Sequence, residues 1–263
     1  MVFYPSTCSV CPSRVASRLK SLCKRGFTLV ELLVVISIIG VLMLIVAPAF
    51  NPINDANNIT KASYDVSGAL GTAQAYAMAN NTYVWVGFFE ENGATSSTNP
   101  ATLGTGRVVM SIVASNDGTN LASGTASLSG TSLVPVYKLI KLNNMHLLNL
   151  PAGSGTGSAF NTRPEVTGTG TQISASSTDG SSPYLFAYPV GSASSPQYQF
   201  ARAIQFSPRG EAKTIINNTV NPLQPIVEIG LEPTHGSTVM TTSSNVAAVQ
   251  LTGINGNVKI YRP

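Results

Sequence analysis

Charged side chains are scarce in this sequence, at 10% of the 263 residues, whereas soluble domains average about 25%. Apolar residues make up 43%, so the chain does not have the composition of a disordered protein, which combines few apolar residues with a high net charge. Its polarity must come mainly from uncharged Ser, Thr, Asn and Gly. The length is sufficient for one or two domains with a buried core.

Cysteine is missing after residue 26, because Cys8, Cys11 and Cys23 all precede that point. The rest of the chain therefore has no disulfide, no thiol nucleophile and no thiolate metal site. Histidine is nearly as rare, since His146 and His235 are the only two and neither has an acidic cluster beside it. A metal site needs several ligands, so we expect two solvated or loop histidines, no metal and no other cofactor.

A catalytic constellation is missing as well. Serine is abundant, but the Gly-x-Ser-x-Gly pattern of a nucleophile elbow does not occur. Asp117 and Asp179 stand alone in the sequence, which argues against a calcium site. We expect that the protein is not an enzyme.

The positive charge is concentrated at the N-terminus. Residues 1–26 contain five of the 15 Lys and Arg residues and no acid. The ten remaining bases face all 11 acids, which gives residues 27–263 a net charge of −1. Phosphate binding depends on clustered bases, and only Lys259 and Arg262 lie close together near the C-terminus. We therefore do not expect a nucleic acid partner.

The longest apolar segment is residues 27–50, in which Glu31 is the only charged residue. About 20 apolar residues span a bilayer as a helix, so the segment predicts a single transmembrane helix. By the positive-inside bias, the basic N-terminus lies in the cytoplasm and residues 82–263 lie in the periplasm, which predicts an inner-membrane protein. Ordinary signal-peptide cleavage is the alternative, because residues 47–50 weakly resemble a signal peptidase site.

A short motif stands at the start of this segment: Lys24-Arg25-Gly26-Phe27-Thr28-Leu29-Val30-Glu31. It resembles the type IV prepilin family, including the pseudopilins of type II secretion, in its basic leader ending in Gly, the following Phe, and the Glu four residues further on. The resemblance implies cleavage between Gly26 and Phe27 by a prepilin peptidase, and N-methylation of Phe27. It also implies assembly with other pilin or pseudopilin subunits on an inner-membrane platform, followed by incorporation into a filament.

Glu31 also has a physical interpretation. An acid in the middle of a membrane costs about 2.5–3.5 kcal/mol on insertion scales, and such groups usually have a partner. Cleavage would leave a cationic Phe27 amine about one helical turn away. A carboxylate facing the amine of a neighbouring subunit would neutralise both charges, so Glu31 is predicted to be an assembly charge. The alternative is a Glu close enough to the interface to stay hydrated.

The helical pattern continues beyond the apolar segment. Gly40 and Pro48 interrupt it, and we expect them to let the helix bend or unwind, unless Pro48 marks the periplasmic edge of the membrane. Over residues 51–81 apolar residues recur with a period near 3.5, which predicts the amphipathic half of the same helix. Asn80-Asn81 is the predicted stop.

Residues 82–263 predict a β-rich head. Strand-like runs separated by small polar loops occur at Tyr83–Phe89, Arg107–Val113, Val134–Leu142, Tyr184–Val190, Phe200–Phe206, Ala212–Ile216, Ile226–Leu231, Val246–Leu251 and Val258–Tyr261. A helix with one apolar stripe must cover it against another layer. We therefore expect an α+β, ladle-shaped, pilin-like fold, with a long N-terminal helix packed on an antiparallel head.

Several side chains of the head carry more specific expectations. Trp85, Phe88 and Phe89 are expected to pack in the core or in the seam between helix and sheet. Phe200–Phe206 mixes polar Arg202 and Gln205 into an apolar run, which fits the pattern of a half-exposed strand only loosely. Residues 151–182 are rich in small polar residues and predict a surface loop that is either functional or mobile.

A narrower resemblance involves three segments of the chain. Leu70–Asn81 with the following strand, the Phe206-Ser-Pro-Arg-Gly210 turn and the Gly253-Ile-Asn-Gly256 turn resemble FimT/GspH-type minor pilins. The ending Val258–Pro263 resembles the group called Verru_Chthon cassette protein D. The resemblance implies a structural subunit, a minor pseudopilin, of a type II secretion or type IV pilus filament. The alternative is a binding module displayed on a filament, either an adhesin or a DNA-capturing minor pilin.

Overall fold

The computed structural model describes residues 27–46, 51–121, 128, 130–175, 184–191, 196–240 and 245–263. The chain forms two compact units, Met1–Pro48 and Ala49–Pro263. The predicted leader, with Gly26 and the three cysteines, lies outside the described residues, and so does Pro48. The ladle shape concerns how the two units sit together, and it stays a prediction.

The first unit contains helix α1 (Leu29–Val46). Every side chain described from residue 27 to residue 44 is exposed. Gly40 lies within α1, and a Cβ placed on it would meet no atom within 4 Å. Among the described residues, no helix combines the length and the apolarity needed to cross a membrane. The transmembrane segment predicted over residues 27–50 therefore stays a prediction.

The second unit begins with helix α2 (Asn51–Ala79). Its buried apolar residues recur at helical spacing, as predicted: Ile59, Ala62, Val66, Ala69, Leu70, Ala73 and Ala77. The predicted stop is confirmed, because Asn81 adopts a left-handed conformation with φ of 49°. Asn tolerates this conformation at a helix C-terminus, and the Thr82 amide closes the last turn on the Ala77 carbonyl.

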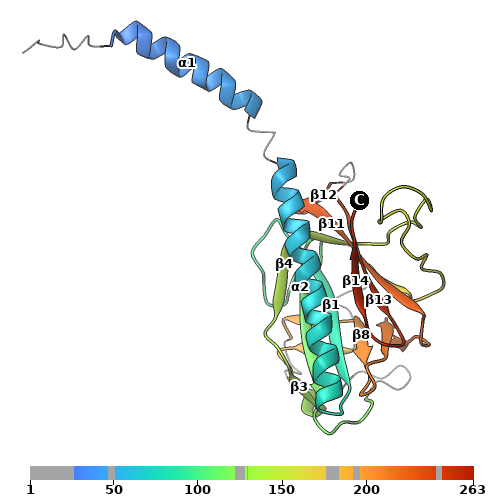
Figure 1. The fold of residues 1–263 in the computed structure, drawn as a ribbon. Coiled ribbons are helices and arrows are strands. Elements are labelled where there is room, and N and C mark those ends of the chain that lie inside the picture. Colours follow the sequence, from blue (N-terminus) through green and yellow to red (C-terminus); the bar gives the residue numbers. More distant parts are fainter. Residues whose placement is uncertain are drawn as a thin grey trace, which may run out of the picture. The chain divides into compact units, whose positions relative to one another are not determined.

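Among the described residues, 12 strands form one sheet in which most neighbours are antiparallel. The principal order is β10-β9-β8-β1-β2-β4-β11-β13-β14, and β5 runs parallel to β11. The strands of this sheet are β1 (Val84–Asn92), β2 (Gly106–Ser115), β3 (Leu133–Pro135), β4 (Ile140–Leu148), β5 (Gln172–Ile173), β8 (Arg202–Phe206), β9 (Ala212–Ile216), β10 (Thr219–Val220), β11 (Ile226–His235), β12 (Thr238–Val239), β13 (Ala247–Thr252) and β14 (Val258–Tyr261). Strands β6 (Phe186–Tyr188) and β7 (Tyr198–Phe200) form a separate pair. The fold is thus α+β, with helix α2 lying across the sheet (Figure 1).

The sheet has a core on each face. One core lies between α2 and the sheet and includes Ile59, Leu70 and Phe88. The other includes Trp85 and Phe89 together with the aromatic side chains of β6 and β7. Successive residues of a strand point to opposite faces, which explains why Phe88 and Phe89 enter different cores. All three aromatic residues predicted to be core residues are buried.

Two predicted strands are each divided in the structure. Val134–Leu142 was predicted as one strand but spans parts of β3 and β4, and Phe200–Phe206 spans the end of β7 and all of β8. The loose fit of Phe200–Phe206 to a half-exposed strand has a structural reason, since every residue of β8 is buried. Arg202 and Gln205 are buried with the apolar residues around them, because β8 lies between β1 and β9 and the β6–β7 pair contributes to the core on one face.

The predicted loop 151–182 is partly structured. It contains β5, and Arg163 within it is buried. The Arg163 Nε donates a hydrogen bond of 2.9 Å to Glu228 on β11, and Gln172 and Gln250 also donate to the Glu228 carboxylate. The described part of this segment is therefore fastened to the sheet through a buried ion pair.

Candidate functional site

The N-terminal unit places the predicted processing and assembly residues around the start of α1. Phe27 is 76% exposed and precedes the helix. Thr28 is the residue before the first helical position, and its Oγ1 accepts a hydrogen bond of 3.2 Å from the Glu31 backbone amide. This is the N-cap contact of a Thr-x-x-Glu capping box. The helix therefore begins directly after the predicted mature terminus.

Glu31 is the only charged residue of α1 and lies in its first turn. The helix dipole favours a carboxylate at this end. The described part of the chain forms no ion pair with the Glu31 carboxylate. A charge-neutralising partner would have to come from outside these residues.

The apolar side chains of α1 that the structure describes, as far as Leu44, are exposed around the helix. Their exposed fractions run from 43% at Val35 to 79% at Leu29. A helix that is apolar all round is normally buried in a protein or in a membrane, and large exposed apolar patches mark interaction sites. The exposed side chains of α1 can therefore pack against other apolar groups, either of protein or of lipid.

A second site lies at the C-terminal end of α2, where three segments noted in the sequence meet. The Gln74 Nε2 donates hydrogen bonds to the carbonyls of Gly210, at 3.3 Å, and Asn255, at 2.6 Å. Gly210 and Gly256 have φ of 82° and 62°, a conformation that only Gly adopts readily. One helix residue thus holds the β8–β9 turn and the β13–β14 turn. The sequence marked these segments but gave no sign that they meet.

The prediction of a solvated or loop histidine is wrong for His146, whereas His235 is exposed as predicted. His146 lies on β4, and its Nδ1 is 2.9 Å from Oε1 of the buried Glu90. His235 ends β11, and its Nε2 is 3.1 Å from Oδ1 of Asp55 on α2. These acids lie far from the histidines in the sequence, so only the folded chain brings them together.

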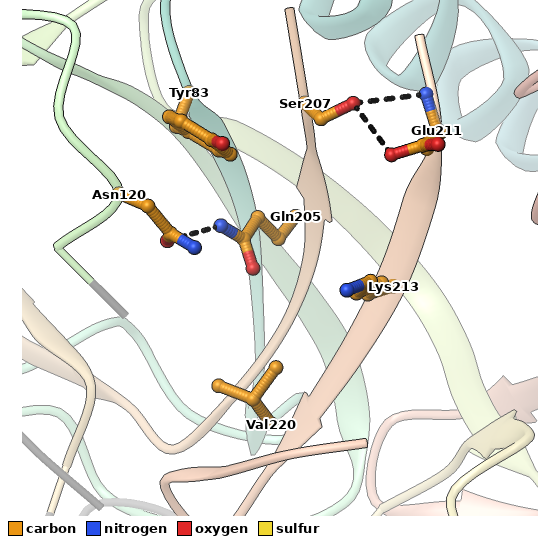
Figure 2. Close-up of a pocket in the computed structure, with 7 residues that line it drawn as sticks. All are labelled: Tyr83, Asn120, Gln205, Ser207, Glu211, Lys213 and Val220. Carbon is orange, nitrogen blue, oxygen red and sulfur yellow. Dashed lines mark hydrogen bonds between the residues drawn. The ribbon is translucent and has the colours of Figure 1, made fainter. Parts of the chain in front are cut away.

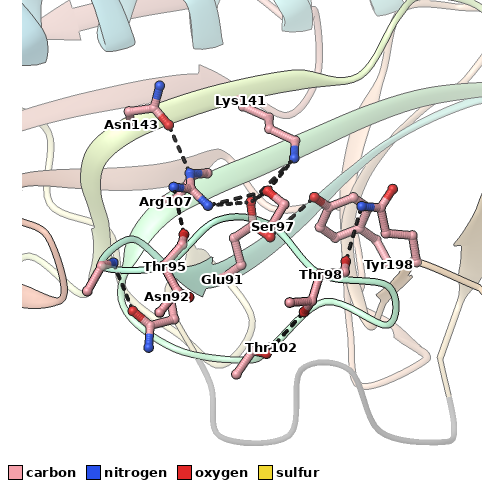
Figure 3. A network of polar contacts seen from close by, with 12 residues as sticks. Glu91, Asn92, Thr95, Ser97, Thr98, Thr102, Arg107, Lys141, Asn143 and Tyr198 are labelled. Carbon is pink, nitrogen blue, oxygen red and sulfur yellow. Dashed lines mark hydrogen bonds and ion pairs between the residues drawn. The ribbon is translucent and has the colours of Figure 1, made fainter.

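A polar network anchors the loop that follows β1 (Figure 3). The buried Glu91 carboxylate accepts hydrogen bonds from Ser97, Arg107 and Tyr198, and Lys141 lies 3.5 Å away. Burial would raise the pKa of Glu91, but the hydrogen bonds from Ser97 and Arg107 and the charges of Lys141 and Arg107 lower it below its ordinary 4.5. All these groups are satisfied within the head, so the network stabilises structure.

Figure 2 shows a small polar pocket on the head, lined by Tyr83, Asn120, Gln205, Ser207, Glu211, Lys213 and Val220. Gln205 donates a hydrogen bond of 2.7 Å to Asn120. The pocket has a volume of about 80 Å³, whereas ligand pockets occupy about 300–1,000 Å³. Within the described ranges, no group of three His, Cys, Asp or Glu residues could hold a metal ion.

Comparison with known families adds one finding. Residues 22–47 match the family model described as the prokaryotic N-terminal methylation motif. The matched segment includes Gly26, Phe27 and Glu31, and it indicates a type IV pilin-like protein of the prepilin type, associated with membranes. The family defined by this motif is structural and not catalytic. No curated protein and no solved structure matches the chain.

Proposed function

We propose that the protein is a structural, pilin-like subunit, of the minor pseudopilin kind, of a type II secretion or type IV pilus filament. A prepilin peptidase cleaves the Gly26–Phe27 bond, and the new Phe27 amine is methylated. The mature chain crosses the inner membrane once, with its N-terminus in the cytoplasm and its head in the periplasm. It then joins other subunits at an inner-membrane assembly platform.

The observation that carries this proposal is the fully exposed apolar helix at the methylation motif. Helix α1 begins two residues after the proposed cleavage site, and its described side chains are all exposed. The head, by contrast, has buried hydrophobic cores of its own. A chain divided in this way suits a subunit whose head folds independently and whose helix packs among other helices or lipids.

The charge of Glu31 gives the assembly step a driving force. A charged side chain in an apolar environment is stabilised by a partner of opposite sign, and methylation leaves the Phe27 amine cationic. Contact between the Glu31 carboxylate of one subunit and the terminal amine of the next would neutralise both charges. Each added subunit would then remove two unpaired charges from the apolar environment.

Processing is tested by mass spectrometry of the N-terminus in the native host. The wild-type chain is expected to begin with N-methylated Phe27, and Gly26→Val is expected to keep the leader, because a bulky residue blocks cleavage. The matched control is Gly40→Val, which changes a glycine inside α1 and should leave cleavage intact. A wild-type terminus at any other residue would refute the processing step.

Assembly is tested by comparing Glu31→Gln with Glu31→Asp. Gln keeps the shape of the side chain but removes the charge, so it should be cleaved normally and enter filaments at least tenfold less, whereas Asp should retain part of the incorporation. Quantitative immunoblotting of sheared filaments provides the measurement. Incorporation of Glu31→Gln at the wild-type level would contradict the charge-pairing mechanism and leave the processing result unaffected.

A further inference from the structure

Three titratable side chains meet where strands β1, β4 and β11 approach one end of the sheet. Glu90 on β1 is 1% exposed and Glu232 on β11 is 5% exposed. His146 on β4 lies beside both. Its Nδ1 is 2.9 Å from Oε1 and 3.1 Å from Oε2 of Glu90, and in the β4–β11 register it stands directly opposite Glu232.

The surrounding backbone holds Glu90 in place. The Gly106 amide donates to the Glu90 Oε1 at 3.0 Å, and the Leu147 amide donates to its Oε2 at 3.3 Å. Gly106 has φ of 113°, and a Cβ on it would overlap the Gly236 carbonyl oxygen. The strand start at Gly106 and the β11–β12 turn are thus packed backbone to backbone at this end of the sheet.

The other charged groups near this end of the sheet have partners of their own. On β1 and β2, Glu91 pairs with Arg107, and Lys141 on β4 lies against the same carboxylate. The charges that act on His146 are those of Glu90 and Glu232. If His146 loses its proton, two buried carboxylates remain without a cation between them.

The same β11 strand reaches helix α2. His235, three residues after Glu232, has its Nε2 3.1 Å from the Asp55 Oδ1. Asp55 lies in the N-terminal part of α2, and the Thr60 hydroxyl on the next turn accepts a hydrogen bond from Arg262. A shift of the end of β11 would therefore disturb the His235–Asp55 contact, which helps to hold the start of α2 against the sheet.

Deprotonation of His146 and deprotonation of Glu232 both lower the stability of the folded head. Burial would lower the pKa of His146, but the hydrogen bond to Glu90 and the charges of Glu90 and Glu232 outweigh it and raise the pKa above 6.5. Burial raises the pKa of Glu232 above 4.5, against the opposing charge of His146. Both groups hold protons more tightly in the folded state, so their stabilisation is complete at low pH and is lost as pH rises through the folded values.

We propose that Glu90, His146 and Glu232 form a pH-responsive latch, which holds the C-terminal end of β11 and the β11–β12 turn against β4 and β1 while His146 is protonated and loosens them when His146 loses its proton. Through His235 and Asp55, opening of the latch weakens the attachment of the start of α2. The latch is a property of the head and does not depend on the proposed filament.

Hydrogen exchange of the full-length chain in detergent tests the latch at pH 6.0 and pH 8.5, after correction for the intrinsic pH dependence of exchange. In the wild type, amides of residues 226–239 and 51–60 should lose protection by tenfold or more at the higher pH. Amides of β8, in the same sheet, should keep theirs. Equal protection of residues 226–239 at both pH values would overturn the proposal.

Two variants assign the response to the latch. His146→Gln keeps a hydrogen-bond donor for Glu90 but cannot be charged, so its protection should be reduced at pH 6.0 and independent of pH. Glu232→Gln removes the second carboxylate and should keep residues 226–239 protected at pH 8.5, which gives a test even if His146→Gln fails to fold. Glu165→Gln, at an exposed loop residue, is the control. A wild-type pH response in Glu232→Gln would contradict the mechanism.

Discussion

The two helices of this protein differ in where their stabilising contacts come from. Helix α2 is amphipathic, and its apolar stripe is covered by a sheet encoded in the same chain. Helix α1 is apolar on every side, and its described side chains are exposed. Within the described residues, the apolar stripe of α2 is buried against the sheet, whereas the side chains of α1 are left exposed. The two helices therefore differ in how much of their packing the described part of the chain provides.

The glutamates of the two regions show the same contrast. Glu91 is buried in the head and contacts Ser97, Arg107, Lys141 and Tyr198. Glu31 has an N-cap contact through its backbone amide, but the described residues offer its carboxylate no ion pair. One carboxylate is satisfied internally, and the other is open to a partner.

The largest effect is expected from truncating a buried aromatic residue under α2. Phe88→Ala should lower the free energy of unfolding of the head by about 3–5 kcal/mol, because it removes a fully buried side chain and leaves a cavity. Leu42→Ala, in α1 and 54% exposed, should leave that free energy unchanged. Urea unfolding followed by fluorescence of Trp85, the single tryptophan, measures both. If both variants lost the same free energy of unfolding, the two helices would not differ in their contribution to the stability of the head.

A smaller effect is expected at Glu91. Glu91→Gln should destabilise the head by about 1–3 kcal/mol at pH 7, because buried donors lose a charged acceptor. Since the pKa of Glu91 is lowered, its contribution is present above pH 4.5 and is lost as pH falls through the folded value. Unfolding curves from pH 7 to pH 3 should therefore converge for wild type and variant. Curves that stay parallel throughout would exclude ionisation of Glu91 as the cause, and Glu165→Gln serves as the control.

The smallest effect is expected from replacing a glycine with alanine, which we compare at Gly210 in the head and Gly40 in α1. Gly210→Ala should destabilise the head by about 1–2 kcal/mol, because a left-handed conformation is unfavourable for a side-chain-bearing residue and the new Cβ would lie 3.0 Å from the Met78 sulfur. Gly40→Ala in α1 meets open space, and Ala favours helices, so head stability should not change while helix content in detergent rises slightly. Circular dichroism and urea unfolding report the two quantities. A destabilised head in Gly40→Ala would show that the units are coupled.

Local patterns were sufficient to predict much of the fold. The 3.5-residue period over α2, the Asn80-Asn81 stop and most of the longer strands are encoded in short stretches of sequence, and the structure contains them. Short pairings were missed, because β5, β10 and β12 have two residues each. A two-residue strand leaves no recognisable alternation in the sequence, and its pairing depends on distant neighbours.

The polar contacts of the head could not be predicted, because their partners are far apart in the chain. Glu90 and His146 are separated by 56 positions, and Arg163 and Glu228 by 65. The burial of Arg202 could not be predicted either, because it depends on the place of β8 between β1 and β9 in the sheet. At the N-terminus the reverse holds, because the motif from Lys24 to Glu31 is continuous in sequence and can be recognised without a fold.

The order of synthesis gives the exposed surface of α1 a further consequence. In this sequence 217 residues follow Val46, and translating them takes about 10–45 s at 5–20 residues per second. The most apolar part of the chain therefore leaves the ribosome before the sheet can form. An apolar environment for α1 has to be available during translation, and the head folds after α1 has entered it.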